Sequence, residues 1–264
     1  MSDVALTLIQ HDPSGTLFDQ TVRIMPRLQQ VFTEIAVFAN ADTAPSSIEY
    51  LAQHGVRLVA ETRRLGLNQV GWLRRAAVEL ALQGPCPFIL YCDFDRILHW
   101  MEFHPQELSD VAQQIGAYDF TVLGRTPRAF ATHPRIQRDT EAIINHVFER
   151  VSGWAWDTGA GARGLARRAA EAIVTGCLDD QISNDVTWPL YLAQRGGFTL
   201  GHLETEGLEF ETPDRFPTEV AQAGGVAQWS EQLDDDPQHW AYRLELARIE
   251  VEAMLPYTQP GDRA

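Results

Sequence analysis

Lysine is absent from this 264-residue sequence, and all 21 of its basic residues are arginine. The absence excludes a Schiff-base lysine, a P-loop lysine and a lysine general base. A bound phosphate would therefore be held by arginine, by a metal ion or by backbone N–H groups. The formal net charge of −15 also argues against a surface for nucleic acid or anionic membranes.

Cysteine is scarce, and long apolar runs are missing. Cys86, Cys92 and Cys177 show no CxxC spacing, so we expect them to be small buried residues rather than metal ligands or disulfide partners. No apolar run approaches the roughly 18 residues of a membrane span. The N-terminus lacks the basic-then-apolar pattern of a signal peptide, and the expected location is the cytoplasm.

The first third of the chain alternates between apolar strands and amphipathic helices. This alternation, with short connections, predicts an α/β fold with a mainly parallel, doubly wound central sheet and helices on both faces. Its ligands would bind at the carboxyl ends of the strands. The strands are expected at 4–9, 34–39, 56–60 and 88–92, and the helices at 17–32, 46–53 and 71–82.

Further elements are expected in the rest of the chain, and residues 215–237 look most like a loop. A Gly-rich loop at 154–164 precedes one of the helices. The helices are expected at 105–115, 135–151, 165–175, 189–194 and 240–254, and the strands at 118–123, 198–203 and 208–211.

The apolar run 88–92 ends in Asp93-Phe94-Asp95. In an extended chain alternate side chains share a face, so Asp93 and Asp95 would point the same way. Two adjacent carboxylates repel each other unless a cation or a proton lies between them. A divalent metal that holds a phosphate is one interpretation, and a solvated polar turn is the other.

A second acidic cluster begins at Asp179-Asp180 and includes Asp185 at the start of a predicted helix. A carboxylate at this position could orient or deprotonate the hydroxyl group of an acceptor. A helix N-cap would require the same residue type at the same place, so both readings stay open.

The order of these parts, over roughly residues 4–211, resembles the GT-A class of nucleotide-diphospho-sugar glycosyltransferases, family-2-like and DxD-containing. The resemblance implies a hexosyltransferase that uses Mn²⁺ or Mg²⁺ and moves a sugar from a UDP- or GDP-linked donor to a hydroxyl acceptor, with a small soluble acceptor favoured. It implies one domain, with a nucleotide-binding half at 1–123, an acceptor-side half at 124–214 and a C-terminal loop and helix at 215–264. No nucleic acid or integral membrane is expected as a partner, and a homodimer is allowed.

The resemblance also implies roles for individual residues. Asp95 would bind the metal, and Asp93 would contact the ribose or reach the metal through water. Asp185 would be the general base or would orient the acceptor, although Asn184 stands where inverting members often carry Glu. The other implied residues are Arg75 or Arg74, Asp42 and the backbone around Gln10 for the nucleotide, and His202, Glu209 or Glu211 as a further metal ligand.

Three more residues are candidates for contacts with the acceptor or a phosphate. Trp100 could flank a sugar, because an aromatic face suits sugar C–H groups, or it could pack in the core. Arg125, or its neighbour Arg128, could bind an anion bidentately, or it could lie in a solvated loop. Arg163, in the Gly-rich segment, has the same two readings.

Two other functions compete with sugar transfer. In a haloacid-dehalogenase-like phosphatase Asp93 would be the nucleophile and Asp95 the acid and base. That class usually places this motif near the start of its domain and needs a lysine, whereas here three strand–helix units precede the motif and lysine is absent. A non-catalytic binding protein on a transferase fold is the second alternative, and retention of both aspartates argues against it.

Overall fold

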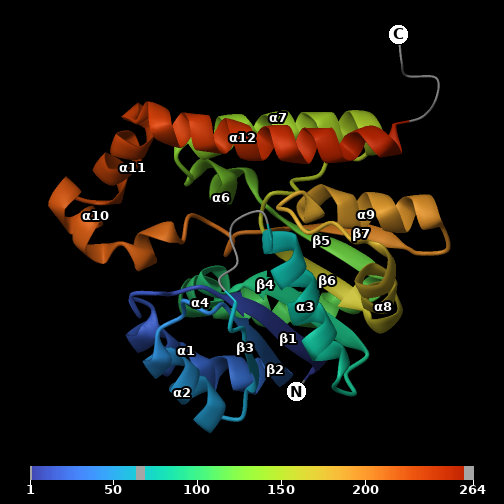
Figure 1. The fold of residues 1–264 in the computed structure, drawn as a ribbon, viewed down its shortest axis with the longest axis horizontal. Coiled ribbons are helices and arrows are strands. Elements are labelled where there is room, and N and C mark those ends of the chain that lie inside the picture. Colours follow the sequence, from blue (N-terminus) through green and yellow to red (C-terminus); the bar gives the residue numbers. More distant parts are fainter. Residues whose placement is uncertain (1, 64–68, 259–264) are drawn as a thin grey trace.

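The computed structural model describes residues 2–63 and 69–258, which form one seven-stranded sheet with the order β3-β2-β1-β4-β6-β5-β7. The sheet is mostly parallel, and the α/β prediction is confirmed (Figure 1). The strands are β1 Ser2–Gln10, β2 Phe32–Ala39, β3 Arg57–Ala60, β4 Phe88–Asp93, β5 Phe120–Arg125, β6 Ala162–Ala166 and β7 Leu200–Thr205.

Helices cover both faces of the sheet. The α-helices are α1 Phe18–Val31, α2 Pro45–Gln53, α3 Val70–Leu82, α4 Phe94–Phe103, α5 Pro105–Gln114, α6 Pro127–Ala131, α7 Arg135–Ser152, α8 Arg167–Gly176, α9 Asn184–Arg195, α10 Pro217–Ala223, α11 Val226–Asp235 and α12 Pro237–Met254.

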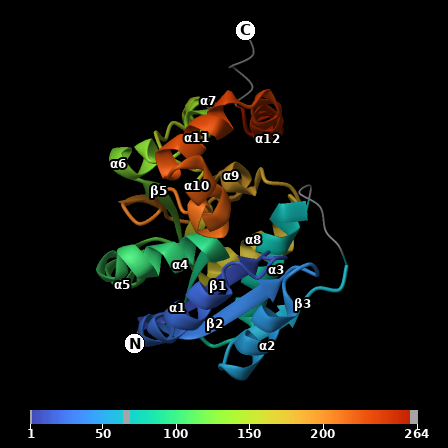
Figure 2. The ribbon, with the colours of Figure 1, turned by 90° about the vertical axis from the view of Figure 1, so that its left-hand side faces the viewer.

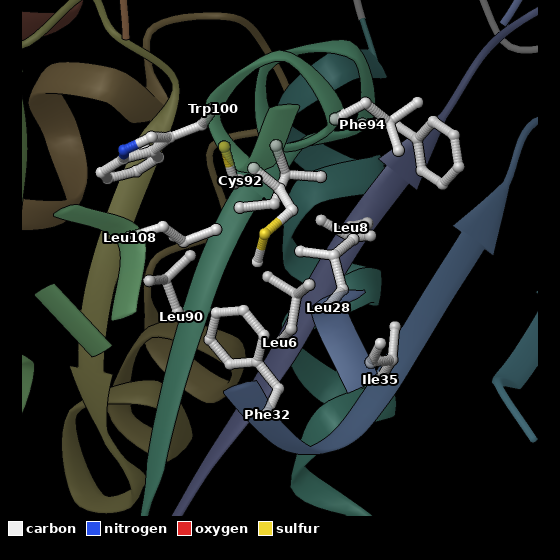
Figure 3. Packing of buried hydrophobic residues seen from close by; sticks show 14 of the residues in the cluster. Leu6, Leu8, Leu28, Phe32, Ile35, Leu90, Cys92, Phe94, Trp100 and Leu108 are labelled. Carbon is white, nitrogen blue, oxygen red and sulfur yellow. The ribbon is translucent and has the colours of Figure 1, made fainter. Parts of the chain in front are cut away.

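The two faces of the sheet bury separate apolar cores. Along β1, Leu6 and Leu8 point into the core under α1, α4 and α5, whereas Ala5 points into the core under α3, α8 and α9. Figure 3 shows the first of these cores, in which Leu90 and Cys92 of β4 pack beside the two leucines. Apolar residues at consecutive strand positions therefore reflect burial on both faces, as is typical of parallel sheets.

The strand order reverses between β1 and β4. From β1 the chain builds outward to β2 and β3, and it then returns through α3 to place β4 on the other side of β1. The connections on the two sides of this point lead away from each other, which leaves a crevice at the carboxyl ends of β1 and β4. Gln10 ends β1 and Asp93 ends β4, so both residues lie at this crevice.

Strand β6 is absent from the sequence prediction, which gave a loop at 154–164 and a helix from 165. The segment pairs antiparallel with both β4 and β5. Its five residues contain a buried arginine and a glycine, so no apolar alternation marks it. A Cβ atom at Gly164 would lie 2.8 Å from the Cβ atom of Ile115, so the strand packs too closely for a larger residue.

The last part of the chain is more helical than predicted. Residues 215–237 form α10 and α11 instead of a loop, and no strand forms at 208–211. The two helices bury few side chains, which is why apolar spacing did not reveal them. Asp234 of α11 accepts hydrogen bonds from the backbone N–H groups of Arg135 and Ile136, at 3.0 and 2.8 Å, and so caps α7.

Helices α7 and α12 run side by side as a further layer (Figures 1 and 2). They share an apolar cluster with α9 that includes Phe148, Val186 and Met254. Residues of both helices help to line the second of the pockets described below. The three cysteines are buried and free, as expected. No helix in the described part of the chain is long and apolar enough to cross a membrane.

Candidate active site

Asp93 and Asp95 lie at the end of β4, but the backbone there is not extended beyond Asp93. Helix α4 begins at Phe94, so Asp95 occupies the first turn of a helix, where the positive end of the helix dipole favours a carboxylate. The expectation that strand alternation aligns the two side chains is therefore wrong. Both aspartates nevertheless line the same pockets, because the turn from strand to helix directs them into one crevice.

Two pockets meet at these aspartates. Asp93, Asp95 and Arg215 line both of them, so the three residues form a junction. The first pocket is bordered by Ile9, Gln10, His11, Leu17, Phe38, Asn40, Leu73 and Phe94 in addition to the junction. The second is bordered by residues of α3, α4, α7, α9 and α12 and by the segment that contains Glu211 and Thr212.

The first pocket has apolar walls and unpartnered amide groups. Gln10 is 1% exposed, and neither atom of its side-chain amide has a hydrogen-bond partner among the residues that the structure describes. The Oδ1 atom of Asn40 is also buried and unpartnered. Buried amides normally have partners, so this pocket is prepared for a flat ligand that offers both donors and acceptors. Asp42 lies outside the pocket lining, near enough to His11 to raise its pKa, although burial and Arg215 have the larger opposite effect.

Arg74 of α3 connects the two acidic motifs of the sequence. Its guanidinium donates to Asp93 at 3.0 Å and pairs with Asp185 at 2.8 Å. Burial opposes its charge, but Asp185 and Asp93 together raise the pKa of Arg74 well above its usual range. Arg75, the other candidate for the nucleotide contact, lines neither pocket and donates to the backbone of Cys177 and Asp179. The structure therefore brings Arg74, and not Arg75, to the crevice.

Asp185 lies at the start of α9 but does not cap it. Its Oδ1 atom accepts from Arg163 at 2.9 Å, and its Oδ2 atom pairs with Arg74. Arg163 is 1% exposed and also donates to the backbone of Thr158. Of the two readings of Asp185, the N-cap is excluded, because both carboxylate oxygens face guanidinium groups. The predicted anion contact of Arg163 is met by Asp185 of the chain itself.

The carboxylates at the junction suit a divalent cation. Asp95 lies 3.3 Å from Arg215. The buried Oε2 atom of Glu211 has no hydrogen-bond partner among the described residues, and Arg96 lies 3.6 Å from it. Burial raises the pKa of Glu211, the charge of Arg96 opposes this effect, and the charge of Asp95 adds to it. No cluster of three His, Cys, Asp or Glu side chains in the described ranges 2–63 and 69–258 forms a complete metal cage. Oxygen donors from one or two carboxylates, completed by ligand phosphates and water, are the usual arrangement for Mg²⁺.

The two other residues predicted as metal ligands lie elsewhere. His202 of β7 stacks on Trp156 with ring centroids 5.8 Å apart, in a third pocket that does not contain Asp95. Glu209 accepts from His104 at 2.9 Å and from Arg128 at 2.6 Å, and it lines neither pocket at the junction. Of the three candidates for the further metal ligand, His202, Glu209 and Glu211, it is Glu211 that lines the second pocket.

Trp100 and Arg125 are structural in this arrangement. Trp100 is fully buried, and its indole N–H donates to Glu107 at 2.8 Å, so the core-packing alternative holds. Arg125 is buried and binds Asp157 through two of its nitrogen atoms, at 2.7 and 2.8 Å. Arg125 therefore forms an internal ion pair. It does not offer an open anion site, and it does not lie in a solvated loop.

Comparison with known proteins gives matches in structure but not in sequence. No protein-family model and no curated protein sequence matches the chain. Glucosyl-3-phosphoglycerate synthase from Mycobacterium tuberculosis, in complex with Mn²⁺, UDP-glucose and phosphoglyceric acid, superposes with a TM-score of 0.53 at 12% identity, over 86% of this chain and 80% of that one. The same enzyme in complex with Mn²⁺, UDP and glucosyl-3-phosphoglycerate gives a TM-score of 0.51 at 13% identity, over 77% of this chain and 71% of that one.

A further structure of that synthase, in complex with Mg²⁺ and UDP, gives a TM-score of 0.51 at 14% identity, over 77% of this chain and 70% of that one. These matches establish that the chain has the GT-A glycosyltransferase fold, as the sequence resemblance implied. At this level of identity the likeness extends to the fold alone.

Proposed function

We propose that this protein is a metal-dependent glycosyltransferase that moves a sugar from a nucleoside diphosphate to a hydroxyl acceptor. The observation that carries the proposal is the junction of two pockets at Asp93, Asp95 and Arg215. A nucleotide sugar has a base, a charged diphosphate and a sugar in that order. The two pockets and the charged groups between them offer matching environments in the same order.

The base would occupy the first pocket. Phe38 and Leu73 offer apolar walls for its ring, and the unpartnered amide of Gln10 offers one donor and one acceptor to its edge. Uracil and guanine both present adjacent donor and acceptor groups. UDP- and GDP-linked donors are therefore both included in the proposal.

The diphosphate would lie at the junction. Asp95, with Glu211, would hold a Mn²⁺ or Mg²⁺ ion, which when bound neutralises the charge that develops on the departing diphosphate. Arg215 adds positive charge at the same place, since it lies against Asp95 and the carbonyl oxygen of His11. Asp93 is fixed by Arg74 and by the hydroxyl group of Tyr91, which suits a positioning role on the ribose side.

The sugar and the acceptor would share the second pocket, where Asp185 would accept a hydrogen bond from the acceptor hydroxyl. Arg74 and Arg163 hold the Asp185 carboxylate in one orientation. In the reaction the bond between the sugar and the phosphate oxygen breaks, and a bond from the acceptor oxygen to the same carbon forms. The acceptor proton passes to the Asp185 carboxylate, and the nucleoside diphosphate departs with the electron pair of the broken bond.

The test is a thermal-shift panel of UDP, GDP and their sugars, each with Mn²⁺ and with EDTA. Ligands that bind the folded state raise the melting temperature, and the rise depends on their affinity and concentration. We expect stabilisation by one nucleotide series and only when metal is present. Absence of any shift with metal and nucleotide together would count against the proposal.

Asp185→Asn separates catalysis from binding. The variant should lose most of its turnover while its affinity for metal and nucleotide stays close to that of the wild type, because Asp185 lies in the second pocket and not in the first. Unchanged turnover would remove Asp185 from the reaction.

A further inference from the structure

Glu250 of α12 occupies a position where an apolar residue would be expected. It lies between Ala247 and Met254, at the three- and four-residue spacing that places side chains on one face of a helix. Ala247 and Met254 pack in the apolar cluster with α7 and α9. Glu250 is 5% exposed, and its buried Oε2 atom has no hydrogen-bond partner within residues 2–63 and 69–258. A buried carboxyl group without a partner lowers the free energy of unfolding. A ligand that forms a hydrogen bond with Glu250 would explain its presence here.

The second pocket is the space that Glu250 faces. Residues of α7 and α12 line this pocket together with Asp185 and Arg74. Glu250 therefore borders the same cavity as the residues proposed to act on the acceptor. It belongs to the C-terminal helix, far in sequence from Asp93 and Asp95.

The charges of the second pocket leave no arginine for an anionic acceptor. Four arginines and six carboxyl groups line this pocket. Each arginine has at least one of five carboxylates within ion-pair distance, and Glu250 is the sixth carboxyl group. The ion pairs are Arg74 with Asp93 and Asp185, Arg96 with Glu211, Arg215 with Asp95, and Arg243 with Glu141. A metal ion and a diphosphate would add charges of opposite sign at the junction. An anionic acceptor would therefore have to compete with a carboxylate of the protein for each of these arginines.

Building on the proposed function, we propose that the acceptor is an uncharged polyhydroxylated compound and that Glu250 binds one of its hydroxyl groups. Burial raises the pKa of Glu250 well above its usual range, and the charges of Asp185 and Glu141 add to this effect. A neutral carboxyl group both donates and accepts a hydrogen bond, which matches a hydroxyl group. Phosphoglyceric acid, bound by the structurally similar synthase, would be a poor acceptor here.

The first test is a panel of acceptors in matched sets, with the nucleotide sugar that the thermal shifts identify and with Mn²⁺. One set is glucose, gluconate and glucose 6-phosphate, and another is glycerol, glycerate and 3-phosphoglycerate. Neutral mono- and disaccharides complete the panel. We expect the largest stimulation of nucleoside diphosphate release from a neutral member. A preference for a phosphorylated or carboxylated member over its neutral counterpart would overturn the inference, as would nucleotide binding without stimulation by any neutral member.

The second test compares Glu250→Leu and Glu250→Gln. Loss of one hydrogen bond should raise the acceptor KM about five- to tenfold in Glu250→Leu, while the amide of Glu250→Gln should keep the KM within about threefold. Metal-dependent nucleotide affinity should be unchanged in both. Glu250→Leu should also raise the melting temperature by about 2–4 °C, because it completes an apolar face. A purely structural glutamate would give the opposite shift.

The matched control is Glu252→Leu on the same helix. Its side chain is 56% exposed and pairs with Arg248, so neither the acceptor KM nor nucleotide affinity should change. An unchanged acceptor KM in Glu250→Leu would overturn the role of Glu250. If no nucleotide binds in the presence of metal, the proposed function itself fails. Nucleotide binding with a preference for anionic acceptors contradicts the acceptor inference alone.

Discussion

Asp93 and Asp185 are held by the same guanidinium group, that of Arg74. The two aspartates belong to separate elements, β4 and α9, and Arg74 on α3 lies between them. In this way one buried cation couples the junction of the pockets to the proposed acceptor site. Without it, two carboxylates would face each other across the crevice with less compensating charge.

Arg74→Met should therefore reduce both stability and turnover. Removal of one partner from a buried ion pair costs about 3–5 kcal/mol, because the remaining charge stays buried. We expect a lower free energy of unfolding in urea and a loss of sugar transfer. Arg75→Met is the matched neighbour. It should lose stability through its contacts with residues 177–180 but keep metal-dependent nucleotide affinity. Equal nucleotide affinity and turnover in Arg74→Met and the wild type would contradict this assignment.

Gly161 keeps the space beside Asp93 open. Its φ of +60° is in the left-handed region, and a Cβ atom there would lie 2.6 Å from the Oδ2 atom of Asp93. Gly161→Ala should displace the carboxylate and weaken metal-dependent nucleotide binding, as measured by calorimetry. Gly153→Ala is the control, because Gly153 has a φ of +80° with no atom within 4 Å. Both variants should lose about 1 kcal/mol or more of stability from backbone strain. Similar nucleotide affinities in the two would refute the role of Gly161.

Gln10 should determine affinity for the base. Gln10→Leu removes the amide from the first pocket and should weaken binding of the nucleoside diphosphate by about 1–3 kcal/mol, since a bidentate amide contact to a base is of that order. Stability should not fall, because the amide has no hydrogen-bond partner in the described part of the chain. Inorganic pyrophosphate with Mn²⁺ provides the control ligand. Its affinity should be the same in the variant, and a parallel loss for both ligands would place Gln10 away from the base.

His133 should make folding sensitive to acid. Burial, with help from the charge of Arg125, lowers its pKa from 6.5 to about 3, so the folded state holds it neutral. The unfolded chain binds the proton first as the pH falls. Above about pH 6.5 His133 is neutral in both states and does not lower the free energy of unfolding. Below that pH the free energy of unfolding falls by about 1.4 kcal/mol per pH unit toward pH 3.

The measurement for His133 is urea unfolding from pH 7 to pH 4 for the wild type and His133→Leu. The difference between their free energies of unfolding should shift in favour of the variant as the pH falls. A pH-independent difference for His133→Leu would contradict the lowered pKa.

The sequence alone predicted the elements that carry strong apolar patterns. The predicted bounds of β1, β2, β4 and α7 lie within two residues of the observed bounds at both ends of each element. Strand β6 was missed because it buries Arg163, whose charge is balanced by Asp185 from another part of the chain. Such a pairing exists only in the folded molecule, and local patterns do not contain it.

The site was predictable in its position but not in its details. The aspartates at the end of β4 and Gln10 at the end of β1 come together because the ends of adjacent parallel strands meet at one edge. The choice between Arg74 and Arg75 depends on the rotation of α3, which their adjacency does not reveal. Arg215 and Glu250 were missed, although the spacing of Glu250 with Ala247 and Met254 is a signal of a buried acid on an apolar helix face.

The most direct measurement is nucleoside diphosphate release from a panel of UDP- and GDP-sugars, compared between the wild type and Asp95→Ala with Mn²⁺ present. We expect release from one donor by the wild type, none by the variant, and loss of activity on addition of EDTA. The variant should keep its fold, since Asp95 is partly exposed and pairs only loosely with Arg215, at 3.3 Å. No release from any donor by the wild type, or equal release by Asp95→Ala, would contradict the account.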